Sequence, residues 1–199
     1  MHDYPSMAGD ILRFLATRDL RDIVLLGHSM GGKAAMELAL TASERVSRLI
    51  VVDIAPRSYP YAPAKEVLDA LLAIDLSHAT SRQEIDDQLA ARGLDRRLRG
   101  FLLMGLARTH DARLRWRFNL RAIAANWSRL GDAISDGRFG GPTLVLRGED
   151  SGYVTSDDLS AVQRYFPNAR MVAIPGAQHW PHIDAPDETY REIREFLCN

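Results

Sequence analysis

The segment Gly27-His28-Ser29-Met30-Gly31 places a serine between two glycines in the pattern Gly-x-Ser-x-Gly. The apolar run Val24-Leu25-Leu26 precedes it, and a segment rich in small residues follows it. A strand, a sharp turn that carries the serine and then a helix form the context in which a serine hydroxyl acts as a nucleophile. The glycines suit such a turn, because strand and helix backbones approach each other there too closely for Cβ atoms. The alternative is a glycine-rich turn without chemistry, so the nucleophile hypothesis requires a histidine and a carboxylate later in the chain.

Candidates for both partners follow later apolar runs. Asp53 comes directly after Leu49–Val52. Aspartate is depleted in strands, and ligand chemistry in parallel sheets lies at the carboxyl ends of the strands, which favours a functional role over capping of the next loop. His179 follows the run Met171–Ile174, with His182 three residues further along.

The amino-acid composition gives no support for nucleic-acid binding, membrane insertion or secretion. The 199 residues include 25 basic and 26 acidic side chains, so charge gives no argument for binding nucleic acid or an anionic membrane. The single cysteine, Cys198, excludes a disulfide within the chain and fits a reducing compartment. No apolar stretch is long enough to span a membrane, and residues 1–20 lack the layout of a signal peptide. We therefore expect a soluble cytoplasmic protein, with no cofactor, no metal and a small molecule as its partner.

Elements that could position these side chains alternate along the chain. Continuous apolar runs predict buried parallel strands at 23–26, 49–52, 143–146 and 171–174. Helical periodicity predicts helices at 4–19, 32–43, 156–165 and 186–197. The segment between the second and third strands shows helical periodicity throughout, at 65–76, 83–92, 98–107 and 114–127. The prediction is an α/β core formed by 1–58 and 139–199, with 59–138 inserted as an all-helical cap.

The predicted cap is rich in arginine. Its arginines include Arg92, Arg96, Arg97, Arg99, Arg113, Arg115, Arg117 and Arg121. They form either a solvated helix surface, balanced by nearby aspartates such as Asp86 and Asp111, or a basic patch. A basic patch would attract an anionic substrate or the phosphates of an acyl carrier.

Three runs together resemble a known family. They are Gly-His-Ser-Met-Gly-Gly-Lys-Ala-Ala-Met, Val-Val-Asp-Ile-Ala-Pro and the late Gly-Ala-x-His-Trp-x-His. They resemble α/β-hydrolase esterases of the YbfF type and their mammalian abhydrolase-domain relatives, and the resemblance covers nearly the whole chain. It implies an α/β-hydrolase fold with a mostly parallel sheet. It also implies a Ser-His-Asp hydrolase of carboxylic esters, with thioesters such as acyl-CoA as further candidate substrates.

The resemblance also bears on the choice of acid. In most α/β-hydrolases the acid is the third residue past a glycine after the strand that follows the cap, which here is Ser151, counted from Gly148. Serine cannot serve as the anion, and Asp150 lies one residue early. The YbfF-like pattern places the acid after the second strand, at Asp53.

The roles that follow are nucleophile, base and orienting acid. We assign them to Ser29, His179 and Asp53, with Asp150 as the reserve acid. The backbone N–H of Met30 is the expected oxyanion donor, because it follows the nucleophile at a helix N-terminus. His28 is expected to pack in the turn, and His182 is the rival to His179.

One feature departs from the family pattern. Family members have four strands before the one that carries the nucleophile, and an early loop supplies the second oxyanion donor, whereas here one helix precedes that strand. The sequence thus resembles an N-terminally shortened hydrolase, from a truncated gene model or with its sheet completed by another chain. We expect weak or absent activity in isolation and self-association through the unpaired edge of the first strand.

Two other functions stay open. The first is another reaction on the same scaffold, such as carbon–carbon bond hydrolysis or cofactor-free haloperoxidation. A serine nucleophile argues against haloalkane dehalogenase or epoxide hydrolase chemistry, which use aspartate there. The second is an inactive fragment that acts through its exposed sheet edge.

Overall fold

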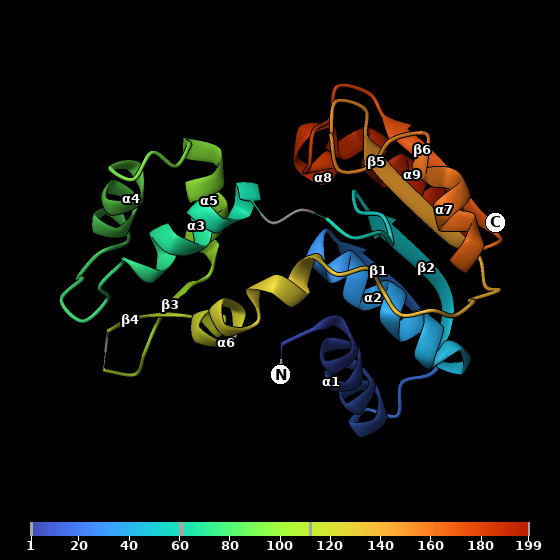
Figure 1. Cartoon of the computed structure of the whole chain (residues 1–199), viewed down its shortest axis with the longest axis horizontal. Coiled ribbons are helices and arrows are strands. Elements are labelled where there is room, and N and C mark those ends of the chain that lie inside the picture. The colour runs from blue at the N-terminus through green and yellow to red at the C-terminus, as the bar shows by residue number, and fades with distance from the viewer. Residues whose placement is uncertain (1, 60–61, 112, 199) are drawn as a thin grey trace. The chain divides into compact units, whose positions relative to one another are not determined.

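The structure is a computed structural model that describes residues 2–59, 62–111 and 113–198. The chain divides into two compact units (Figure 1). The sheet unit consists of His2–Tyr59 and Asp132–Asn199, and the helical unit consists of Pro60–Gly131. Within the described residues, no helix is both long and apolar enough to cross a membrane.

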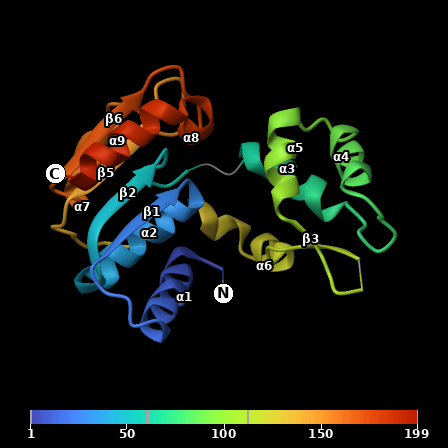
Figure 2. The same cartoon turned by 180° about the vertical axis from the view of Figure 1, so that it is seen from behind.

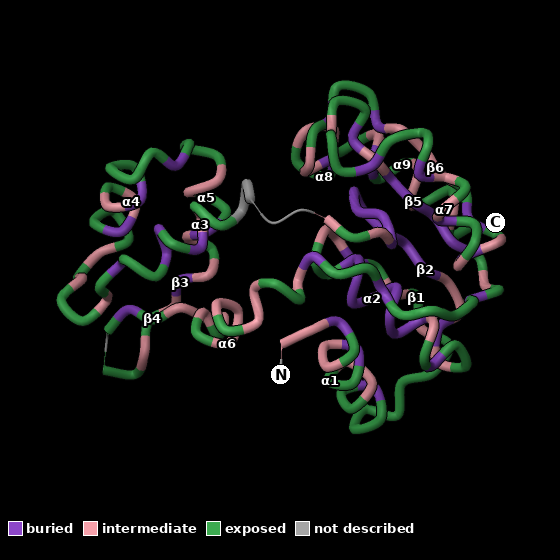
Figure 3. The backbone as a smooth tube through the Cα atoms, viewed as in Figure 1, coloured by how far each residue is buried: buried purple, intermediate pink, exposed green. Residues whose placement is uncertain are grey.

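The sheet unit contains four parallel strands in the order β1-β2-β5-β6. Their bounds are β1 Ile23–His28, β2 Val46–Val52, β5 Thr143–Gly148 and β6 Ala169–Ile174. Each contains one of the apolar runs that predicted it, so the α/β prediction is confirmed. The inner strands β2 and β5 are largely buried (Figure 3), as their continuous apolar sequences require.

Helices cover both faces of this sheet (Figure 2). On one face lie α1 (Tyr4–Thr17), α2 (Met30–Thr41) and α7 (Asp158–Tyr165), and a short 3₁₀ turn, η1 (Ser43–Arg45), leads from α2 into β2. On the other face, α8 (Pro181–Asp184) and α9 (Pro186–Cys198) lie against β5 and β6. Each face has its own apolar cluster, with Met36 of α2 packed on the first face and Phe196 of α9 on the second.

Strand β1 forms one edge of the sheet, because among the described residues it pairs with β2 alone. Ile23 and Leu25 pack into the cluster beneath α2. Val24 and Leu26 point to the opposite face, which α9 does not cover at this edge, and they are 46% and 50% exposed. The edge strand therefore presents an apolar row beside an unpaired backbone.

The helical unit has a separate core. It contains α3 (Ala62–Leu72), α4 (Arg82–Ala90), α5 (Arg96–Met104), α6 (Leu120–Ala125) and the 3₁₀ helix η2 (Trp127–Gly131). Its buried side chains include Leu71, Ile74, Ile85, Leu89 and Leu102. These residues repeat at helical spacing, which is why the sequence predicted helices here.

One prediction for this unit is corrected, because the unit is not all-helical. Strands β3 (Leu106–Arg108) and β4 (Leu114–Trp116) form an antiparallel pair where the sequence predicted helix at 98–107 and 114–127. The run Leu114-Arg115-Trp116 also alternates apolar, polar and apolar, which suits a strand. The backbone N–H of Thr109 donates to the Arg113 carbonyl oxygen at 2.8 Å and closes the turn.

Two buried charged residues of α2 fix the segment that re-enters the sheet unit. The Lys33 ammonium, 1% exposed, donates to the carbonyl oxygen of Asp132. It also lies 5.2 Å from the centroid of the Tyr4 ring and 4.9 Å from that of Tyr59. One turn later, the Glu37 carboxylate accepts the backbone N–H of Ser135 at 2.9 Å.

Burial gives Lys33 a measurable pH signature. Loss of hydration is the main cause that lowers the pKa of Lys33, from 10.5 to about 8. Between those values the unfolded chain holds a proton that the folded chain has released, so linkage makes stability rise with pH. Replacing Lys33 by methionine removes this group. We expect the free energy of unfolding of the wild type, minus that of Lys33→Met, to rise by roughly 2 kcal/mol from pH 8 to pH 10. Urea denaturation of both proteins at each pH measures the difference, and a constant difference would contradict the assignment.

Candidate active site

Ser29 lies on the turn between β1 and α2, in a backbone conformation rare for a residue with a side chain. Its φ is 53° and its ψ is −122°. The backbone N–H of Ser29 donates to Val52 O at 2.9 Å, and its carbonyl accepts the N–H of Gly32 at 2.8 Å. Such a conformation costs on the order of 1–3 kcal/mol and persists only where its surroundings enforce it. Here the enforcing contacts are one to the neighbouring strand and one to the first turn of the helix.

Close contacts around the turn between β1 and α2 leave no room for a Cβ atom on Gly27 or Gly32. A Cβ atom on Gly27 would lie 2.3 Å from the Gly31 carbonyl oxygen, a backbone atom that cannot rotate away. A Cβ on Gly32 would lie 2.6 Å from a methyl carbon of Ile54. The packing of the turn therefore confirms the sequence argument for Gly27, whereas Gly31 has open space at its Cβ position and the argument is wrong for that glycine.

Asp53 occupies the equivalent position on the adjacent strand. Its backbone N–H donates to Leu146 O at 2.8 Å, and its φ is 52°. Since His28 pairs with Val52 in the parallel register of β1 and β2, the next residues along, Ser29 and Asp53, leave the sheet side by side. The Asp53 side chain is fully buried, at 0% exposed.

Three donors satisfy the buried Asp53 carboxylate. The backbone N–H of Gly148 donates to Oδ1 at 3.0 Å. The Ser151 hydroxyl and His179 Nδ1 both donate to Oδ2, the latter at 2.8 Å. A buried carboxylate needs such partners, because its hydration is lost and nothing else offsets the cost.

His179 joins Asp53 to Ser29. With Nδ1–H donated to Asp53, Nε2 carries no proton and can accept one, and Ser29 Oγ lies 3.0 Å from it. This tautomer is the one that a general base toward the serine hydroxyl requires. The structure thus brings Ser29, His179 and Asp53 into one hydrogen-bonded chain within the sheet unit.

The backbone of His179 is held by His28, which the sequence predicted only to pack in the turn. His28 Nε2–H donates to the His179 carbonyl oxygen at 2.7 Å. Burial is the main cause that lowers the pKa of His28, and the neighbouring imidazoles of His179 and His182 lower it further. His28 is thus neutral at pH 7 and serves as a donor. Gly148 also has no room for a side chain, because a Cβ there would lie 2.1 Å from Gln178 O.

The rival candidates lie elsewhere. Asp150 is exposed, and its backbone N–H donates to Ala177 O at 2.9 Å. The His182 ring lies edge-on to that of His28, with 5.2 Å between ring centroids.

Met30 is the first residue of α2, so its N–H is one of those that a helix leaves without a helical acceptor. It therefore stays a candidate oxyanion donor.

Sequence reasoning missed an aromatic side chain at this site. The Tyr153 ring stacks on the His179 ring, with 3.9 Å between centroids and 21° between planes. Nothing in the short segment Gly152-Tyr153 indicates this, because the contact joins the ends of two different strands. The sequence analysis considered Ser151 only as a residue that cannot serve as the acid, yet its hydroxyl donates to the Asp53 carboxylate.

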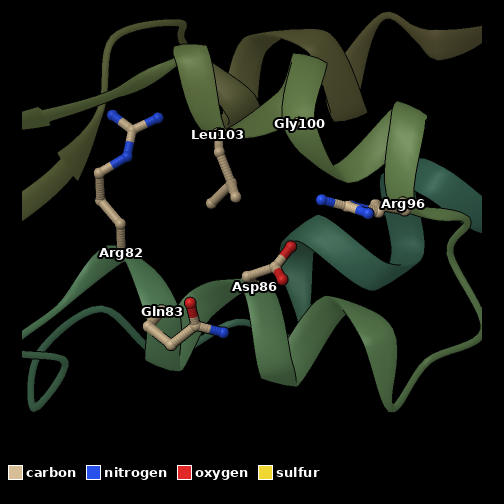
Figure 4. Close-up of a pocket in the computed structure, with 6 residues that line it drawn as sticks. All are labelled: Arg82, Gln83, Asp86, Arg96, Gly100 and Leu103. Carbon is tan, nitrogen blue, oxygen red and sulfur yellow. The ribbon is translucent and has the colours of Figure 1, made fainter.

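The helical unit has an open pocket of about 300 Å³ between α4 and α5 (Figure 4). It is lined by Arg82, Gln83, Asp86, Arg96, Gly100 and Leu103. Of the cap arginines, Arg99 pairs with Asp86 at 2.7 Å and Arg113 with Asp111 at 3.0 Å. These two pairs fit the solvated, charge-balanced surface. Among the described residues, no group of three or more His, Cys, Asp and Glu side chains could hold a metal ion.

Comparison with known proteins identifies the family. A family model described as alpha/beta hydrolase fold matches residues 2–186. The chain belongs to the α/β-hydrolase family. Among curated relatives of this α/β-hydrolase, the zebrafish (Danio rerio) sn-1-specific diacylglycerol lipase ABHD11 is 36% identical over 98% of the chain and 63% of its own length.

Two other relatives support the resemblance to the YbfF type. Esterase YbfF of Escherichia coli is 32% identical over 98% of the chain and 75% of its own length. The solved structure of a marine microorganism esterase is 37% identical, with a TM-score of 0.92 over 98% of this chain and 78% of its own. The present α/β-hydrolase spans 63% and 65% of the lengths of the zebrafish and mouse lipases.

The turn that carries Ser29 makes a direct prediction for the two glycines of the Gly-x-Ser-x-Gly segment. Gly27→Ala forces Cβ against the Gly31 carbonyl, so we expect a loss of several kcal/mol of stability, as for other overpacked sites. Gly31→Ala is the matched control, because no atom lies within 4 Å of its Cβ position and alanine favours the helix. Thermal unfolding compares the two variants. Equal melting temperatures would show that the strand and the helix are not in close contact here.

Proposed function

We propose that this α/β-hydrolase is a serine hydrolase that cleaves carboxylic esters through an acyl-enzyme. Ser29 is the nucleophile, His179 the general base and acid, and Asp53 the orienting carboxylate. The observation that carries the proposal is the hydrogen-bonded chain from Ser29 Oγ through His179 to the buried Asp53. The esterase and lipase names of relatives at 32–37% identity support the same reaction class.

Acylation begins when His179 Nε2 takes the Ser29 hydroxyl proton and Oγ attacks the acyl carbon of the ester. The Nδ1–H bond to Asp53 holds the tautomer and stabilises the imidazolium that forms. The imidazolium then gives its proton to the leaving alcohol as the carbon–oxygen bond breaks, which leaves the acyl group on Ser29.

Deacylation repeats these proton transfers with water. His179 takes a proton from water, the hydroxide oxygen attacks the acyl carbon, and the proton passes to Ser29 Oγ as the acid leaves. The backbone N–H of Met30 donates to the oxyanion in both halves of the reaction. One such donor contributes about 3 kcal/mol to lowering the barrier.

A thioester such as acyl-CoA is the second substrate class in this proposal. A thiol leaves by the same route as an alcohol, and nothing in the proton transfers distinguishes the two. Carbon–carbon bond hydrolysis and haloperoxidation are less well supported, because the curated relatives named above are an esterase and lipases.

The choice of acid gives the first test. Asp53→Asn removes the charge opposite the imidazolium and disturbs the tautomer, so kcat for a p-nitrophenyl ester should fall about 10³- to 10⁴-fold. Asp150→Asn is the control, because this exposed residue lies outside the hydrogen-bonded chain, and it should keep kcat within about twofold of the wild type. Initial rates on short-chain p-nitrophenyl esters and on acyl-CoA measure both effects and rank the two substrate classes. If Asp150→Asn alone abolishes turnover, the assignment of Asp53 is wrong.

We further propose that the exposed edge of β1 pairs with the same edge of a second copy. The edge offers unpaired backbone groups beside Val24 and Leu26, which are about half exposed, and such edges associate readily. Leu26→Lys should then shift the chain toward the monomer in sedimentation velocity experiments. Leu197→Lys on α9, at a comparable exposure of 42%, should not. A wild-type chain that stays monomeric at all concentrations would contradict the pairing.

A further inference from the structure

The Tyr153 side chain covers one face of the His179 imidazole. The rings are nearly parallel, with 3.9 Å between their centroids. Tyr153 lies in the loop after β5, four residues before the N-cap of α7, whereas His179 lies in the loop after β6. The His179 side chain is 19% exposed. The stack therefore joins two loops and limits the solvent around the imidazole.

A third loop, after β2, holds Tyr153 in place. The Tyr59 hydroxyl accepts the backbone N–H of Ala55 at 2.8 Å and donates to the Tyr153 carbonyl oxygen at 2.7 Å. Burial raises the pKa of Tyr59 to about 12, so this hydroxyl keeps the proton that it donates. The Tyr59 and Tyr153 rings also contact each other, with 5.9 Å between centroids.

Arg57 strengthens the same connection. Its guanidinium donates to the Tyr153 carbonyl oxygen at 3.2 Å and pairs with Asp158 at 2.9 Å. It also lies 4.3 Å from the centroid of the Tyr59 ring. The backbone of Tyr153 is thus fixed by the side chains of Tyr59 and Arg57.

We propose that Tyr153 is a positioning residue that orients the His179 imidazole by stacking, and that Tyr59 acts on catalysis through Tyr153. The proposal rests on the proposed function of Ser29 and His179. The hydrogen bonds at Nδ1 and Nε2 hold the two nitrogens of the imidazole in place but restrain the tilt of the ring plane about the line through these nitrogens less strongly. A parallel ring against one face removes that freedom.

The stack also acts differently on the two charge states of His179. An aromatic face carries partial negative charge, and a cation over it is stabilised relative to a neutral ring. The imidazole is neutral before Ser29 is deprotonated and charged afterwards. The contact therefore favours the state that follows proton transfer and should affect kcat more than KM.

The test compares Tyr153→Leu with Tyr153→Phe, using p-nitrophenyl acetate and a fluorophosphonate probe that labels the serine nucleophile. Leucine removes the flat ring, so kcat and the labelling rate of Ser29 should each fall about tenfold with little change in KM. Phenylalanine keeps the ring and should restore both to within about twofold. Tyr190→Leu is the control, because this tyrosine is 64% exposed on α9, and it should match the wild type.

A double-mutant cycle tests the role of Tyr59. Tyr59→Phe removes the hydroxyl that holds the Tyr153 carbonyl and should lower kcat a few-fold. In the Tyr153→Leu background it should have almost no further effect, because the two residues then act as one unit. An undiminished effect in that background would show that Tyr59 acts by another route. If Tyr153→Leu loses its cooperative thermal transition, kcat of Tyr59→Phe and Tyr153→Phe tests the proposal instead. A few-fold lower kcat for Tyr59→Phe, with Tyr153→Phe within about twofold of the wild type, would support it, and an unchanged kcat for Tyr59→Phe would contradict it.

The outcomes separate this proposal from the one on which it rests. A wild-type chain that neither hydrolyses the ester nor takes up the probe on Ser29 would overturn the proposed function. A wild-type chain that does both, with a folded Tyr153→Leu variant at the same rates, would overturn the stacking proposal alone. A rise in KM with unchanged kcat and labelling rate would show that Tyr153 contacts substrate and does not orient His179.

Discussion

The buried Asp53 carboxylate is the interaction on which the rest of the site depends. It has no exposed surface, and its charge is offset by donors from two other strand ends: the backbone N–H of Gly148, the Ser151 hydroxyl and the His179 imidazole. Because an unpaired buried charge is strongly destabilising, this carboxylate favours only conformations in which the loops after β5 and β6 lie against it. The hydrogen bond from His179 to Asp53 thus orients the imidazole and also stabilises the packing of the two loops.

The sheet register places the reacting groups with little freedom. Ser29 and Asp53 are both the first residue past their strands, both have positive φ, and both donate a backbone N–H to the next strand along. A single geometric pattern, repeated on adjacent strands, therefore brings Ser29 and Asp53, the proposed nucleophile and acid, to the same end of the sheet. His28 adds a third constraint, because it lies at the end of β1 and holds the backbone of the histidine that Ser29 must reach.

Much of this arrangement could be predicted from the sequence. Continuous apolar runs predicted four strands, because both faces of the inner strands are buried. The glycines around Ser29 predicted a crowded turn, which holds for Gly27 and does not hold for Gly31. The choice of Asp53 came from resemblance, since a carboxylate after β2 and one after β5 are equivalent candidates until their side-chain directions are known. The β3–β4 hairpin was missed because Leu114 and Phe118 have the i, i+4 spacing of a helix, although Leu114 and Trp116 also alternate as in a strand.

The Tyr153–His179 stack could not have been predicted in this way. The two side chains contact each other although they lie 26 positions apart in the sequence. The residues around Tyr153 and around His179 show no pattern that predicts this contact. The contact between Ser151 and Asp53 was missed for a similar reason. A serine at the usual position of the acid shows that it is not the acid, but it does not show that its hydroxyl donates to the Asp53 carboxylate. Sequence patterns predict which strand ends carry polar groups, whereas contacts between loops depend on the three-dimensional path of the backbone.

The most direct test of the account is detection of the acyl-enzyme. The folded chain is mixed with p-nitrophenyl acetate, quenched in acid within the first turnover and analysed by intact-mass and peptide mass spectrometry. The account predicts one acetyl group per chain, on Ser29, formed together with a burst of p-nitrophenol and absent from His179→Ala. Ester turnover with no acetyl group on Ser29, or with the acetyl group on another residue, would contradict it.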